Sequence, residues 1–76
     1  MKCIYEIRYE LQWESSEPSH WEEQNVRVLS GENAQHAIDT ARDAALKQHR
    51  LDDNGRESKC IGFRLRGVVL VAQAEL

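Results

Sequence analysis

The chain has 76 residues and a formal net charge of −3, so it is small and mildly acidic. An acidic balance argues against a nucleic-acid binder, which would carry a concentrated basic face. No apolar run approaches the ~20 residues that a membrane span needs, and the alternating start Met-Lys-Cys-Ile-Tyr-Glu is not a signal peptide. We therefore expect one domain over residues 1–76 that remains in the cytoplasm.

A domain of this size usually needs support from disulfides, a metal, oligomerisation or unusually good packing. Cys3 and Cys60 share no CxxC spacing, which predicts two free, buried thiols in a reducing compartment. His20, His36 and His49 show no metal-ligand spacing. We expect no disulfide, metal or cofactor, and packing and oligomerisation remain as supports.

Residues 3–13 alternate between apolar and polar side chains, which predicts a strand with one buried face. Residues 14–20 are polar and contain the proline, so they form a loop. A second strand is expected over residues 21–29, with a polar first half that suits a sheet edge. The two strands and the loop form a hairpin.

Ser30 is predicted to cap a helix over residues 31–50, with Glu32 favouring the positive end of the helix dipole. Small apolar residues recur at three- and four-residue spacing and predict the buried stripe: Ala34, Ala37, Ile38, Ala41, Ala44 and Ala45.

A turn cluster at 52–55 precedes a last strand over residues 59–73. Ile61, Phe63 and Leu65 are predicted to face the helix, and Cys60, Gly62, Arg64 and Arg66 the opposite side. Gly67 predicts a bulge or bend, so either Val68 and Leu70 or Val69 and Val71 face the helix.

These elements predict an α+β fold of strand, strand, helix and strand. The last strand is expected to pair with the first, giving a three-stranded antiparallel sheet of order 2-1-3 with one helix on one face. The face carrying Tyr5, Ile7 and Tyr9 is covered by the helix, and the other face is open to water.

Sequence motifs for catalysis are missing: there is no glycine-rich phosphate loop, nucleophile elbow or Ser-His-Asp spacing. We therefore expect that the chain is not an enzyme. Arg64 and Arg66 are expected to form cross-strand ion pairs with Glu6 and Glu10, and an anion-binding role is the alternative.

The hairpin tip concentrates acidic and aromatic residues without a neighbouring Lys or Arg in the sequence. One interpretation is a packed tryptophan pair above a solubilising loop. The other is a partner-binding patch, since tryptophan is enriched at interface hot spots and a basic partner would relieve the self-repulsion. The candidate residues are Trp13, Glu14, Glu17, Trp21, Glu22 and Glu23.

The last strand has more apolar positions than a strand with one wet face requires. Such an excess predicts self-association through that strand, with Ile4, Val68 and Leu70 as candidates and Val69 and Val71 if a bulge shifts the phase.

In size, acidity and element order the whole chain resembles small accessory proteins of phages and mobile elements, including the anti-CRISPR inhibitors. The resemblance implies a non-catalytic protein-binding module whose acidic surface blocks a basic surface on a host protein complex. The alternative is a small structural or regulatory homodimer assembled through the last strand. A weak nucleic-acid-binding fold is disfavoured by charge.

Overall fold

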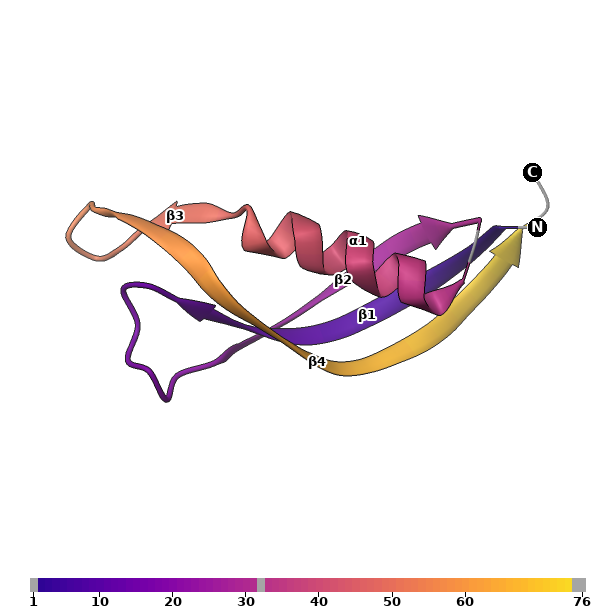
Figure 1. Cartoon of the computed structure of the whole chain (residues 1–76), viewed down its shortest axis with the longest axis horizontal. Helices are drawn as coiled ribbons and strands as arrows, with labels where there is room; N and C mark the ends of the chain where they lie inside the picture. Colours follow the sequence, from indigo (N-terminus) through magenta and orange to yellow (C-terminus); the bar gives the residue numbers. More distant parts are fainter. Residues whose placement is uncertain (1, 32, 75–76) are drawn as a thin grey trace.

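The computed structural model describes residues 2–31 and 33–74, which form an α+β fold with one helix and four strands (Figure 1). The elements in chain order are β1 (Lys2–Trp13), β2 (Glu22–Ser30), α1 (Ala34–Leu46), β3 (His49–Leu51) and β4 (Glu57–Ala74). All strand pairs are antiparallel, and the sheet order is β2-β1-β4-β3. The helix lies along one face of the sheet, as predicted.

The sheet contains a strand that the sequence prediction missed, so the expected three-stranded sheet is corrected to four strands among the described residues. β3 occupies the end of the predicted helix, which stops at Leu46, and it pairs only with residues 57–59 of β4. Its three residues are all exposed and show no alternation, which is why their sequence gave no strand signal. The predicted turn between β3 and β4 is confirmed, with Asp52 accepting backbone hydrogen bonds from Asn54 and Arg56.

β1 lies between β2 and β4, and its pairing with β4 is irregular. The β1–β4 register shifts at three places, which leave Ile61, Arg66 and Val71 of β4 without a partner residue on β1. Such bulges move the following residues to the other face of the sheet. Two predictions are therefore wrong: Ile61 is exposed, and Cys60 faces the core opposite Trp13.

The same register shows on which face of the sheet the side chains after Gly67 lie. Val68 lies opposite Ile7, and Leu70 lies opposite Tyr5, so both lie on the side of the sheet that the helix covers. Val69 lies opposite Glu6 on the open face.

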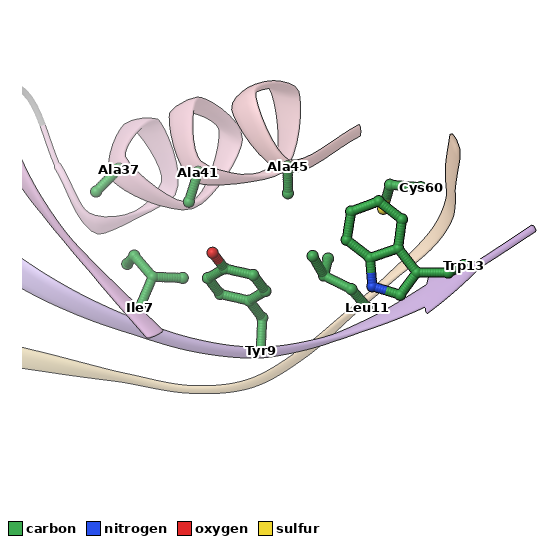
Figure 2. Packing of buried hydrophobic residues seen from close by; sticks show 8 residues of the cluster. All are labelled: Ile7, Tyr9, Leu11, Trp13, Ala37, Ala41, Ala45 and Cys60. Atoms are coloured by element: carbon green, nitrogen blue, oxygen red, sulfur yellow. The ribbon is translucent and has the colours of Figure 1, made fainter. Parts of the chain in front are cut away.

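The core is thin and is built from small side chains of the helix against large side chains of β1 (Figure 2). Ala37, Ala41 and Ala45 project toward the sheet at four-residue spacing, and all three are buried. Ala44, predicted in the same stripe, is exposed because it lies off this line. The buried apolar residues are Ile7, Tyr9, Leu11, Trp13, Ala37, Ala41, Ala45 and Cys60.

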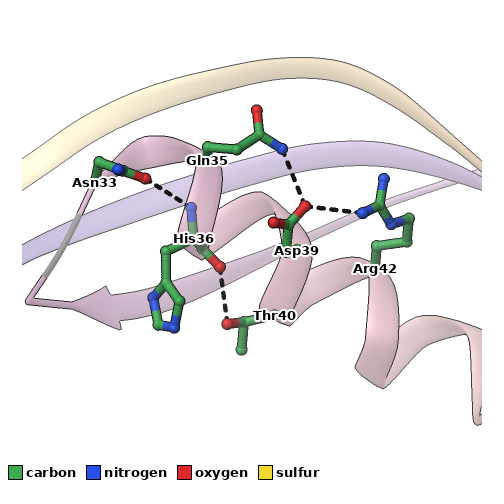
Figure 3. Close-up of polar contacts among 6 residues, drawn as sticks. All are labelled: Asn33, Gln35, His36, Asp39, Thr40 and Arg42. Atoms are coloured by element: carbon green, nitrogen blue, oxygen red, sulfur yellow. Dashed lines mark hydrogen bonds and ion pairs between the residues drawn. The ribbon is translucent and has the colours of Figure 1, made fainter.

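The helix begins one turn later than predicted, because Asn33 and not Ser30 is its N-cap (Figure 3). The Asn33 side chain accepts a hydrogen bond from the backbone N–H of His36 at 2.9 Å. Ser30 is instead the buried last residue of β2. Glu32, predicted in the first helical turn, lies outside the described residues.

The molecule is long and narrow, measuring 47 × 20 × 15 Å. Its radius of gyration is 14.2 Å, whereas a compact chain of this length has one of about 11 Å. The two cysteines are free thiols, as predicted, with Cys3 at one end of β1 and Cys60 beside the other. Cys60 is buried, whereas the predicted burial of Cys3 is wrong, because its side chain is only half-buried. Within the described ranges, no helix has the length and apolar character to cross a membrane.

Candidate functional site

The hairpin tip does not present the predicted aromatic and acidic patch, because Trp13 is core. Its side chain lies on the helix side beside Cys60 and is only 3% exposed (Figure 2). The guanidinium of Arg50, from β3, stacks over the indole at 4.2 Å from the ring centroid. A cation over a tryptophan face is attracted by the electrons of the ring, so Arg50 covers Trp13 and removes it from the surface.

Glu22 is also withdrawn from the predicted patch by Arg50. The two side chains form a two-point ion pair, with nitrogen–oxygen distances of 3.0 and 2.8 Å. This hydrogen bonding lowers the pKa of Glu22 and outweighs the opposing effect of burial, with further lowering from the charges of Arg50 and His20 and from the Trp13 indole. The expectation that no cation neutralises the acidic tip is therefore wrong for Glu22, since Arg50 reaches it from a distant part of the chain.

Trp21 lies on the opposite face of the sheet, so the two tryptophans do not form the expected cross-strand pair. The tip of its ring lies beside Gly62, where an added Cβ would approach Trp21 to 3.0 Å. Gly62 is the partner of Gln12, which has the parity of the open face. The guanidinium of Arg64 stacks over the Trp21 ring at 4.4 Å from its centroid.

Three of the predicted acidic residues, Glu14, Glu17 and Glu23, are exposed. Within the described ranges, no Lys, Arg or His side chain lies within ion-pair distance of these three carboxylates. Glu14 and Glu17 share the loop between β1 and β2, whereas Glu23 lies opposite Glu10 on the open face. The surface at the tip is therefore smaller than predicted.

The start of this loop is fastened to β4. The backbone N–H of Glu14 donates to the carbonyl of Lys59 at 2.8 Å, and the hydroxyls of Ser15 and Ser58 are 2.8 Å apart. Ser58 is fully buried, which fixes where the loop leaves the sheet.

The open face of the sheet carries arginines above carboxylates. Arg64 and Arg66 both bind Glu10, which confirms the predicted cross-strand ion pairs for that residue. Glu6 instead pairs with Arg8 and Arg27. The two glutamates are 18% and 12% exposed while the four arginines are 49–67% exposed, so the arginine side chains form the outer layer.

The outer edge of β4 is the longest unpaired surface in the part of the chain that the structure describes. β3 covers only residues 57–59, and one further backbone bond, from Cys60 N–H to Gln48 O, reaches β4 from that side. Beyond it, no described strand pairs with the outer edge over residues 61–74. Residues 67–73 of this edge carry no charge, and Val69, Leu70 and Val71 are all exposed.

The predicted self-association residues do not share one face. Ile4 lies on the open face, on the same side as Val69, whereas Val68 and Leu70 lie on the helix side. The prediction grouped these three residues, with Val69 and Val71 as the alternative if a bulge shifted the phase. The bulges in β4 distribute its apolar side chains over both faces instead. What these residues of β4 share is the free edge.

Ser30 and His36 are the described pair that most resembles a nucleophile with its base, with 3.0 Å between the hydroxyl oxygen and Nδ1. Ser30 is only 3% exposed, and its hydroxyl also lies 3.3 Å from the carbonyl oxygen of Asn33. This pair joins the end of β2 to the start of α1. In the described ranges, no group of three or more His, Cys, Asp or Glu side chains could hold a metal ion.

Comparison with known proteins gives no relative: no protein-family model, no curated protein and no solved structure matches the chain.

Proposed function

We propose that the chain is a non-catalytic protein-binding module that binds by adding a partner strand to the outer edge of β4. The observation that carries this proposal is the unpaired edge over residues 61–74, which carries no charge over residues 67–73. An exposed strand edge offers a row of backbone N–H and C=O groups, and an extended segment of another chain can satisfy them. Main-chain hydrogen bonds then supply affinity, and side chains on alternate faces supply specificity.

The side chains of this edge fit such a contact. Leu65 and Leu70 are 42% and 48% exposed on the helix side, beside the core but uncovered by the helix. A partner strand would place its own side chains next to them and remove apolar surface from water, at about 25 cal/mol for each Å² buried.

A second candidate surface is the loop between β1 and β2, where Glu14 and Glu17 are exposed. Two unneutralised carboxylates favour a basic partner and would accelerate its approach at low salt. Inhibition of a host complex, in the manner of the phage accessory proteins that the chain resembles, would use this surface. The edge of β4 is the better supported of the two, because Trp13 and Glu22 no longer belong to the tip.

The proposal is tested with an edge variant, Leu70→Lys/Val71→Lys, which adds two charges at positions that are already exposed. The matched control is Leu51→Lys, since Leu51 is exposed on β3, away from the edge. Circular dichroism should show that both keep the fold.

In capture experiments from a lysate of the producing cells, the wild type and the control should retain the same partner protein and the edge variant should lose it. Retention by the edge variant would contradict the proposal. Loss in Glu14→Lys/Glu17→Lys alone would move the site to the loop, and capture of no other protein would limit binding to copies of the chain itself.

A further inference from the structure

We infer that the strand received by β4 is β4 of a second copy, so that two chains form a symmetric dimer with one continuous sheet. This inference rests on the proposed function of the β4 edge and names its partner. It is carried by the charge pattern of the two free edges, by the geometry of a two-fold axis and by the apolar surface left beside the helix.

The charge pattern selects β4 and not β2 for self-pairing. Residues 67–73 of β4 carry no charge, so two copies can lie antiparallel there without opposing like charges. The outer edge of β2, in contrast, carries Glu22, Glu23 and Arg27. Pairing of β4 with β2 of the next copy would also produce an open-ended array, whereas pairing of β4 with β4 closes after two chains.

The symmetry fixes the arrangement of the two copies. In an antiparallel pair, directly opposite residues must either both point their backbone groups at the other strand or both point them away. Two identical strands satisfy this requirement only when one residue lies directly opposite the same residue of the second copy. The two-fold axis passes midway between these two residues. The axis is then perpendicular to the sheet, and both helices lie on the same face.

This arrangement closes an apolar strip that a monomer leaves open. Leu65, Val68 and Leu70 lie on the helix side of β4, and none of them is fully buried. In the dimer Val68 and Leu70 of the second copy lie beside Val68 and Leu70 of the first, between the two helices. The opposite face then carries the arginine layers of both copies.

The bulges restrict the length of the pairing. Arg66 and Val71 interrupt the ladder, so the regular segment between them is residues 67–70, and the axis is expected at Val68, Val69 or Leu70. The narrow shape of the chain supports the same conclusion. Among the described residues, three of the eight buried apolar side chains are alanines, so a 20 Å wide molecule gains a broader core by doubling across β4.

Sedimentation equilibrium tests the inference directly. The wild type and Leu51→Lys should pass from monomer to dimer between a few micromolar and several hundred micromolar, and the edge variant should remain monomeric. A wild type that is monomeric over the whole range would overturn the inference, and so would a dimer that persists in the edge variant. A monomeric wild type would leave the proposed function to be decided by the capture experiment.

Single cysteines locate the axis. Val68→Cys, Val69→Cys and Leu70→Cys are made separately in a Cys3→Ser background, since Cys60 is buried. At the axis two identical residues have Cα atoms about 4.5–5.5 Å apart, which permits a disulfide. One of the three variants should give a covalent dimer on oxidation and the control Leu51→Cys should not. Equal cross-linking in all four would contradict β4 pairing.

Discussion

Arg50 illustrates how a side chain on β3 organises the hairpin tip between β1 and β2. It covers the face of Trp13 and neutralises Glu22. In the predicted helix over residues 31–50 it would be the last residue. Because the helix stops at Leu46 and the chain turns into β3, Arg50 comes beside two residues far from it in the sequence.

Replacing Arg50 should destabilise the tip. Arg50→Ala removes one cation–π contact and one exposed ion pair, which together should lower the free energy of unfolding by about 1 kcal/mol. Urea unfolding measures this, with Arg56→Ala as the control because Arg56 lies in the turn between β3 and β4.

The stability lost in Arg50→Ala should become smaller as the pH falls. The pKa of Glu22 lies below its ordinary value of 4.5, so its ionised form stabilises the fold above that pH and the contribution disappears as the pH falls through the lowered pKa. The difference between the wild type and Arg50→Ala should therefore be larger at about pH 7 than at about pH 3. A difference that grows on acidification would contradict the assignment.

At the scale of elements, the helix packs on the sheet through alanine, and this close approach is sensitive to added volume. Ala41→Leu places three extra carbons between helix and sheet, and overpacking of this kind costs about 1–3 kcal/mol. Ala44→Leu is a matched control, since Ala44 is exposed on the same helix. Thermal unfolding should show a lower midpoint for Ala41→Leu only, and equal midpoints would mean that the buried face is assigned wrongly.

The elements with strong periodicity were predictable and the irregular ones were not. Alternation over residues 3–13 predicted β1, and the alanine spacing predicted the buried helix face apart from Ala44. The bulges at Ile61, Arg66 and Val71 were not predictable, because a bulge is fixed by twist and pairing with β1 and leaves little local signal. Only Gly67 marked the region, one residue away from the bulge at Arg66.

The candidate sites, too, were only partly predictable from the sequence. The apolar run of β4 was recognised in the sequence as an excess, and the structure locates it on a free edge. The acidic tip was overestimated, because a sequence does not show that Arg50 reaches Glu22 across 28 positions. Whether such a carboxylate is neutralised depends on its partners in the folded structure and not on the composition of the loop.

At the scale of the whole molecule, the long narrow shape and the free edge have one origin. β1 and β4 are long strands, and one helix of 13 residues covers only part of the sheet that they form. β3 is too short to shield the length of β4. The consequence is a surface of unpaired backbone groups beside uncovered apolar side chains, which is the basis of the proposed strand addition.

Amide hydrogen exchange, followed residue by residue, tests this claim most directly. At a few micromolar, the outward-facing N–H groups of residues 67–70 should exchange fast, and at several hundred micromolar they should slow by about tenfold or more as the edge becomes paired. The N–H groups that face β1, and those on the outer edge of β2, should exchange at the same rates at both concentrations. If the outward N–H groups of β4 exchange equally fast at both concentrations, the central claim that β4 pairs with β4 of a second copy is contradicted.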